Sequence, residues 1–112
     1  MMLREKKFED ELQFYRLALT SKDNTKVRHH LGRAHVLSQN STLKHLYVHA
    51  LMFGFALRTF DLKETFGQIL RLVVTVPGHM IGKVPRGNIG WSTVGLTQVM
   101  QVPEDLESVL TE

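Results

Sequence analysis

The stretch NTKVRHHLGRAHVLSQNSTLKHLYVHALMFGFALRTF, residues 24–60, decides the fold. It predicts two helices, at about 25–39 and 42–59, that fold back on each other where Gln39-Asn40-Ser41-Thr42 interrupts the apolar pattern. The second of these helices is apolar almost all the way round. A helix with that pattern belongs in the interior of a small domain, so we expect the rest of the chain to pack around it.

The residues before this stretch predict another amphipathic helix, at about 6–20. Its apolar stripe consists of Phe8, Leu12, Tyr15 and Leu19. Asn24 is the expected N-cap of the second helix, and Ser41 or Thr42 that of the third.

A fourth helix is predicted at about 62–76. Asp61 and Glu64 have the spacing of a capping box at its start, and Pro77-Gly78 is the expected stop. The expected buried stripe is Phe66, Ile69, Leu70 and Val73.

Residues 77–102 differ from the helical segments in composition. Glycines at 82, 87, 90 and 95 and prolines at 77 and 85 predict an ordered strap, which Trp91 anchors to the helices. Pro103 then opens a last short helix at 104–110.

A weak repeat at an offset of 38 residues indicates that the helices form two similar units, because Leu17-Ala18-Leu19 and Asp23 line up with Phe55-Ala56-Leu57 and Asp61. We therefore predict an all-α single domain over residues 1–112, built from two stacked antiparallel helical hairpins of tetratricopeptide-like character. Two units are fewer than a free-standing solenoid needs, so the strap or a second protomer is expected to cover the exposed end.

The amino-acid composition excludes several kinds of functional site. The chain has 112 residues and no cysteine, which excludes disulfides, thiolate metal sites and cysteine nucleophiles. Residues 1–10 are rich in charge, and no apolar run reaches membrane-spanning length. We therefore expect a cytoplasmic protein without a membrane partner, and delivery to a host cell by some other signal stays open.

Basic residues predominate in the middle of the chain. Residues 22–86 hold ten lysines and arginines and three acids, whereas the chain from Glu104 onward holds four acids and no base. The simpler interpretation is a solvated surface partly covered by the acidic last helix, and the alternative is an acidic protein partner. Nucleic acid is not expected, because the aromatic residues have core spacing, namely Phe53, Phe55, Phe60 and Phe66.

Three histidines converge in the predicted hairpin. His45 and His49 lie four residues apart on one helical face, and His35 approaches them when the chain turns near residues 40–41. Three imidazoles from two facing helices are a usual way for a helical bundle to present a transition metal. The alternative is that His35 and His49 are hydrogen-bonded interior residues and that His45 lies in solvent.

Two motifs carry a resemblance to a known family. They are HLGRAHVLSQ at residues 30–39, followed by His45, His49 and Met52, and PG at 77–78 followed by VPRGNIG at 84–90. Over about residues 12–103 the chain resembles a bacterial family of small, histidine-containing proteins, domain-of-unknown-function family 3703. The resemblance implies an all-helical fold, and the family's histidine pattern implies metal binding as one role.

One position departs from that family pattern, which has a glutamate where this chain has Gly32. A carboxylate there, opposite His49, would complete a shell of three histidines and one glutamate. Glycine leaves the shell open and lets another helix or chain approach closely, which favours protein binding over metal binding.

Two functions from different classes follow, and neither is catalytic, because Ser41 and Ser92 have no positioned base. The first is a protein-interaction module without cofactor: a small regulator or inhibitor, itself a homodimer, that covers an acidic surface of a partner such as a bacterial effector enzyme. Its expected contacts are Arg33, Lys44, Arg58, Met80, Arg86 and Trp91. The second is a zinc-, nickel- or copper-binding protein with the ligands His35, His45 and His49, completed by His30 or water.

Overall fold

The computed structural model describes residues 2–111, and all the secondary structure in that range is helical. Four long helices, α1 (Leu3–Thr20), α2 (Asn24–Ser38), α3 (Thr42–Arg58) and α4 (Leu62–Met80), precede the short α5 (Glu104–Glu107). The all-α prediction is confirmed; the end residues 1 and 112 of the predicted domain lie outside the described range.

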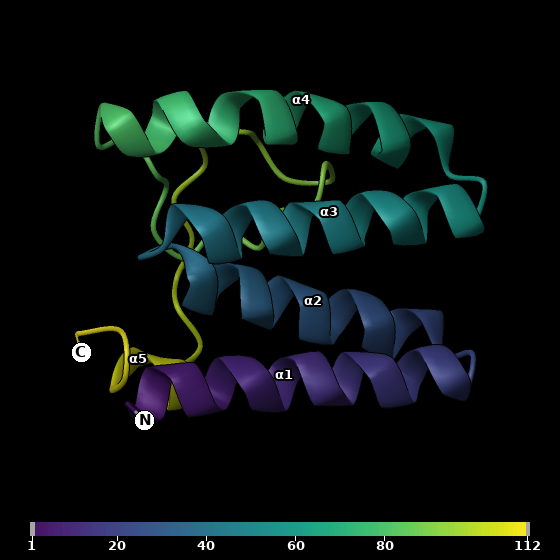
Figure 1. Cartoon of the computed structure of the whole chain (residues 1–112), viewed down its shortest axis with the longest axis horizontal. Coiled ribbons are helices and arrows are strands. Elements are labelled where there is room, and N and C mark those ends of the chain that lie inside the picture. The colour runs from purple at the N-terminus through teal and green to yellow at the C-terminus, as the bar shows by residue number, and fades with distance from the viewer. Residues whose placement is uncertain (1, 112) are drawn as a thin grey trace.

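The four long helices form a row in which neighbours run in opposite directions (Figure 1). Helix α1 packs on α2, α2 on α3 and α3 on α4, so α1 and α4 are the two ends of the row. The pairs α1–α2 and α3–α4 are the two predicted antiparallel hairpins, which are thereby confirmed.

Short polar side chains start three of these helices. The Asp23 carboxylate accepts a backbone N–H of the first turn of α2 at 3.1 Å, so the cap lies one residue before the predicted Asn24. Ser41 and Asp61 cap α3 and α4 in the same way, at 3.3 Å and 3.0 Å, as predicted. These caps set the helix starts and thereby the register of the histidines.

Helix α4 does not stop at Pro77-Gly78, and that prediction is wrong. Pro77 lies inside the helix and removes one hydrogen bond from its ladder, but the helix continues for one more turn to Met80. It ends where Gly82 adopts a left-handed conformation with φ of +71° and the amide of Lys83 donates to the carbonyl of Gly78 at 2.8 Å.

The predicted buried stripe of α4 is also wrong. Its residues face outward, with exposed fractions of 69% for Phe66, 43% for Ile69, 49% for Leu70 and 67% for Val73. The buried side chains of α4 are polar instead, namely Glu64, Thr65, Gln68, Arg71 and Thr75. Apolar periodicity identifies a helix face but does not say on which side the rest of the protein lies.

Of the four phenylalanines assigned to the core, only Phe55 is buried. Phe53 is half-buried, whereas Phe60 follows α3 in a left-handed turn with φ of +55° and is 88% exposed. The core lies instead between α1, α2, α3 and the segments that follow α4, with Leu31, Val48 and Met52 at its centre.

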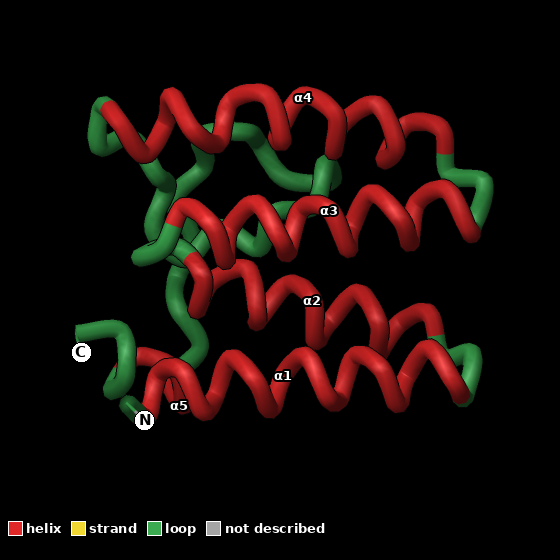
Figure 2. The backbone as a smooth tube through the Cα atoms, in the orientation of Figure 1, coloured by secondary structure: helices red, strands yellow, loops and turns green. Residues whose placement is uncertain are grey.

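The strap, residues 81–103, crosses from the end of α4 past α3 and α2 to α5, which lies beside α1 (Figure 2). Trp91 is 2% exposed, and its indole N–H donates to the carbonyl of Arg28 at 3.0 Å. The predicted anchor is therefore confirmed. The last helix is shorter than predicted, although Leu106 and Val109 around it are fully buried.

Within residues 2–111, none of the helices combines the length and the hydropathy of a bilayer-crossing segment.

Candidate metal centre

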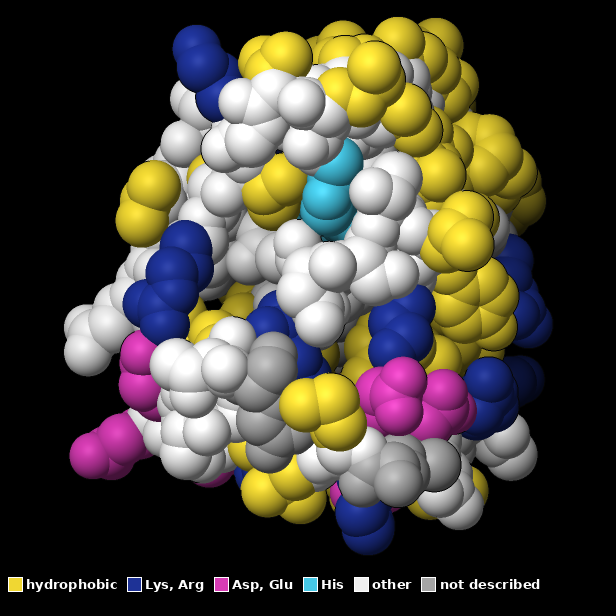
Figure 3. Space-filling view, turned by 60° about the vertical axis from the view of Figure 1, so that its left-hand side comes forward, with side chains coloured by type: hydrophobic (Ala, Val, Ile, Leu, Met, Phe, Trp, Pro, Cys, Tyr) yellow, Lys and Arg dark blue, Asp and Glu magenta, His cyan; other side chains and the backbone are white. Residues whose placement is uncertain are grey.

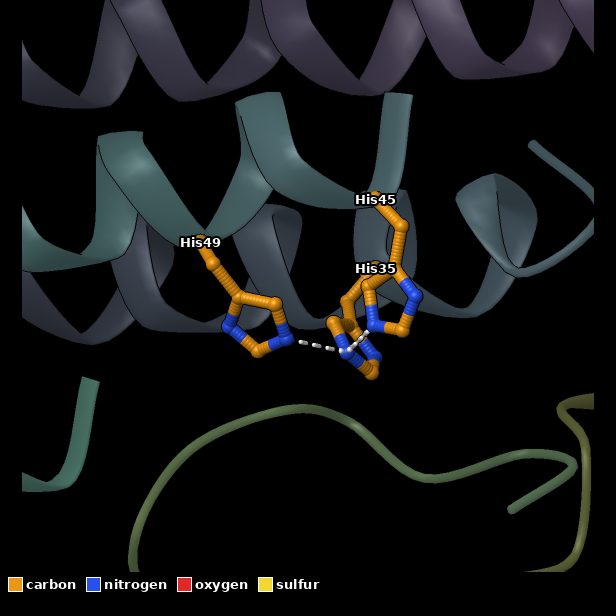
Figure 4. A group of neighbouring side chains, drawn as sticks. All are labelled: His35, His45 and His49. Atoms are coloured by element: carbon orange, nitrogen blue, oxygen red, sulfur yellow. Dashed lines mark hydrogen bonds between the residues drawn. The ribbon is translucent and has the colours of Figure 1, made fainter. Parts of the chain in front are cut away.

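His35 from α2 and His45 and His49 from α3 point at one another (Figure 4). The Nε2 atom of His35 lies 3.0 Å from Nε2 of His49 and 2.8 Å from Nε2 of His45. One ring nitrogen from each of the three lies within 4.8 Å of the other two. The predicted convergence is confirmed, and His45 is not the solvent-exposed residue that the alternative required.

All three rings are buried, with exposed fractions of 3% for His35, 6% for His45 and 2% for His49. Burial lowers the pKa of His45 to about 3 and that of His49 to about 4, and the neighbouring histidine charges add to the effect for His45. Burial also holds the pKa of His35 well below its usual range. At neutral pH each ring is therefore uncharged and carries one N–H and one lone pair.

The outer nitrogens of two rings have partners that can only accept. His35 Nδ1 lies 2.5 Å from the carbonyl oxygen of Asn88, and His49 Nδ1 lies 2.7 Å from Oε1 of Gln68. The Gln68 amide group is itself oriented, because its NH2 donates to Glu64 at 2.9 Å and to the carbonyl of Gly90 at 3.0 Å. The N–H of His35 and that of His49 are therefore both at Nδ1.

This assignment leaves His35 Nε2 and His49 Nε2 as bare lone pairs that face each other at 3.0 Å. Two acceptors cannot form a hydrogen bond with each other, so these two lone pairs remain available to a cation. A proton is disfavoured because burial lowers the pKa of both rings. The separation of these two atoms is close to that in a metal site, since Zn–N bonds of about 2.0–2.1 Å place two tetrahedral nitrogen ligands roughly 3.4 Å apart. The three ring nitrogens lie within 4.8 Å of one another, so a shared ion requires the rings to adjust.

The third ring is held by a fourth histidine. His45 Nδ1 lies 2.8 Å from His79 Nε2, which can accept a hydrogen bond from Nδ1–H and thereby leave a lone pair on His45 Nε2. His79 is in the last turn of α4, the turn that sequence reasoning ended too early. Each of the three rings thus has an outer-shell partner of the kind that orients metal-bound histidines.

The strap closes one side of the cluster. Gly90 has φ of +85°, and a Cβ atom on it would lie 2.5 Å from Cδ2 of His35. Only glycine lets the backbone approach the imidazole this closely. Asn88 supports the turn, because its side chain accepts from the amide of Gly90 at 2.8 Å and donates to the carbonyls of Gly95 and Gln98.

Another side opens into a pocket of about 260 Å³ between α4 and the strap. Its walls combine apolar groups with two basic side chains, Arg71 and Lys83. The space-filling view shows a histidine side chain at the surface, among backbone and uncharged side-chain atoms (Figure 3). A water molecule or a small anion can therefore reach the cluster from the pocket.

His30, the predicted fourth ligand, is not part of this cluster, and that prediction is wrong. Its Nδ1 lies 2.7 Å from the Glu11 carboxylate, and its ring contacts those of Phe14 and His29. Gly32 lies beneath the strap, where a Cβ would meet Ile89 at 3.3 Å. The carboxylate linked to the cluster is Glu64, through Gln68 and His49.

The six residues predicted to contact a partner protein are scattered over the molecule. Arg33 pairs with Glu11 and Asp105, Lys44 with Glu5 at 3.4 Å, and Arg86 with Glu107 at 2.5 Å. Trp91 is buried in the core, so its side chain offers no surface to a partner, contrary to that prediction. Arg58 and Met80 are exposed.

Sequence reasoning missed four residues around the cluster, namely Gln68, His79, Asn88 and Gly90. Gln68 was overlooked because the polar face of α4 was expected to face solvent. Asn88 and Gly90 are in the motif VPRGNIG, which carries the family resemblance but in which only Arg86 was predicted to be a site residue.

Residues 2–110 match the family described as a protein of unknown function, DUF3703. The chain belongs to the DUF3703 family. No curated protein and no solved structure matches it. The two motifs that carried the resemblance meet at the histidine cluster of this DUF3703 protein, since HLGRAHVLSQ supplies His35 and VPRGNIG supplies Asn88 and Gly90.

Proposed function

We propose that this protein binds a divalent transition-metal ion through the Nε2 atoms of His35, His45 and His49. The observation that carries the proposal is the pair of bare nitrogens on His35 and His49, which face each other at 3.0 Å in a buried site. Neutral imidazoles suit zinc, copper and nickel, whereas magnesium and calcium prefer oxygen ligands.

The surroundings support reversible binding more than catalysis. A metal held by three protein ligands keeps an open fourth position, and the three histidines border the pocket of about 260 Å³. Among the described residues that line this pocket there is no carboxylate, and Arg71 and Lys83 are its charged groups. A metal-handling or metal-sensing role needs such an open position for exchange but no general base.

Metal analysis of protein purified without a histidine tag tests the proposal. We expect one zinc, nickel or copper ion per chain, and its loss in His35→Ala and in His49→Ala. The matched control is His29→Ala, because His29 is exposed and outside the cluster. A wild-type protein that takes up no stoichiometric ion from any of the three metals, by direct analysis and by calorimetric titration, would overturn the proposal.

The predicted interaction module is the second candidate function. What supports it is the apolar outer face of α4, which includes the exposed Met80. A small regulator or inhibitor would use such a face to cover a partner, and a partner bound there would exclude a second copy of the chain from the same face. Co-purification from the native cell tests this role, with the wild-type protein and the Met80→Glu variant as the two baits. The role requires a protein that the wild type captures and that Met80→Glu does not.

A further inference from the structure

Helix α4 turns its polar side chains inward and its apolar side chains outward. Inside, Gln68 accepts from His49, and Arg71 donates to the carbonyls of Trp91 and Val94 in the strap. The inner face is therefore occupied with holding the histidine cluster and the strap. The outer face has no such task within the described chain, and hydrophobic side chains gather where α4 lies (Figure 3).

The outer apolar residues of α4 follow a heptad pattern. They recur at alternating intervals of four and three residues over five steps, which places them at successive a and d positions of a coiled-coil seam. Their exposed fractions run from 41% at Val76 to 80% at Met80. We call these residues the α4 seam: Leu62, Phe66, Ile69, Val73, Val76 and Met80.

The area of this surface is that of a stable interface. Together with the flanking Phe60, Leu70 and Ile81, the α4 seam exposes on the order of 1,000 Å², taking roughly 150–250 Å² for a large side chain. The largest apolar patch of an ordinary monomer covers about 300–600 Å², and a standard interface buries about 800 Å² per partner. The α4 seam and these three flanking residues together exceed the first value and reach the second.

We propose that the α4 seam pairs with the α4 seam of a second copy of this chain to form a twofold dimer. A seam with a 3.5-residue period matches another helix of the same period, and the second copy supplies one. The seam contains no charged residue, so its self-pairing across a twofold axis brings no like charges together. Helix α4 also ends the row, so a second α4 continues it (Figure 1).

The two α4 helices run antiparallel in this dimer. That direction continues the alternation of the row from α1 to α4 and aligns the helix dipoles favourably. The pairing is independent of the metal proposal, because the α4 seam lies on the side of α4 away from Gln68.

Sedimentation equilibrium of Val73→Glu tests the dimer. The wild type should have twice the mass of the 12.8 kDa chain, both in chelator and with zinc, and Val73→Glu should halve that mass while it keeps the wild-type helix content by circular dichroism. The matched control is Leu17→Glu, which places the same charge on an exposed apolar residue of α1 and should leave the dimer intact.

The direction of pairing is tested by cross-linking, for which the absence of native cysteine is an advantage. With a short bis-maleimide, Leu62→Cys mixed with Met80→Cys should give a covalent dimer, and Leu62→Cys alone should give none. Self-linking of Leu62→Cys would overturn the antiparallel arrangement.

Three outcomes would overturn the dimer itself. Two of them are a wild type that is monomeric at 100 µM: one in which it binds phosphatidylcholine vesicles, so that the face would contact lipid, and one in which it does not. The third is a Val73→Glu protein that remains dimeric. None of them bears on metal content, which is measured on the same samples, so the two proposals fail separately.

Discussion

At the scale of single residues, the metal proposal depends on where two protons sit. Asn88 and Gln68 present acceptors to the outer nitrogens of His35 and His49, and this leaves the inner nitrogens bare. An interior histidine pair without a metal would instead share one N–H between the rings. The Gln68 amide is the simplest place to disturb this arrangement.

Replacing Gln68 with leucine should weaken metal binding about 10–100-fold, because the change removes the acceptor that holds the His49 tautomer. The measurement is a competition titration against a chromophoric chelator. Gln13→Leu is the control, since Gln13 is exposed on α1. Equal affinities of the Gln68→Leu and wild-type proteins would show that the Gln68 contact does not orient a ligand.

The metal-free protein should lose stability as the pH falls. Its His45 and His49 have pKa values of about 3 and about 4 when folded, against 6.5 in an unperturbed chain. Below pH 6.5 the unfolded chain binds protons that the folded chain excludes, so the stabilisation is complete above pH 6.5 and is lost towards pH 4.

From pH 7 to pH 5 each of these histidines should lower the free energy of unfolding by on the order of 2 kcal/mol. Urea unfolding in chelator at the two pH values measures this difference, and His45→Gln should reduce it. The same free energy of unfolding at pH 7 and pH 5 would contradict the burial of neutral rings.

At the scale of elements, the strap holds the cluster as much as the helices do. The Gly90 backbone lies against the His35 ring, and the backbone carbonyl of Asn88 accepts a hydrogen bond from Nδ1–H of that ring. The hairpin α2–α3 brings the three rings together, and α4 and the strap decide which nitrogen of each ring faces inward.

Substituting Gly90 with alanine should destabilise the protein by roughly 1–3 kcal/mol and also reduce metal content. The added Cβ would clash with His35, and alanine is strained at φ of +85°. Gly54→Ala is the matched control: it is helical with no atom within 4 Å of the new Cβ, so it should be neutral or stabilising by up to about 1 kcal/mol. Urea denaturation measures both, and equal effects of the two variants would rule out a tight strap.

The elements also show what the sequence could predict. The capping residues and the polar break at residues 39–42 predicted α2 and α3. The i, i+4 spacing of His45 and His49 placed both on one face of α3, and the turn between the helices placed His35 opposite that face. Helix α4 was harder, because its apolar stripe was assigned to a core that it does not face. Because of that error Gln68 was not predicted to contact the cluster. The wrong stop at Pro77 left His79 outside the predicted helix. The strap contacts of Asn88 and Gly90 depend on a tertiary path that local patterns do not contain.

At the scale of the whole molecule, the row of helices has different functions on its different sides. One side holds the cluster and the pocket beneath the strap, and the α4 end presents the α4 seam. An ion that binds only the folded protein must raise its stability by mass action.

A zinc concentration 100 times the dissociation constant should add about 2.7 kcal/mol to the stability. For a chain of this size that corresponds to a rise in Tm of roughly 10–20 °C, which differential scanning calorimetry measures and which a chelator should reverse. His49→Ala should show no rise. A wild-type Tm that is unchanged by zinc, nickel and copper would contradict the linkage.

X-ray absorption spectroscopy of the zinc-loaded, untagged protein tests the central claim most directly. The account predicts three imidazole nitrogens at about 2.0–2.1 Å with the outer-shell scattering of histidine rings, and one further light-atom ligand. The His49→Ala protein should lose this signal. A zinc ion with one imidazole or none in its first shell would contradict the account.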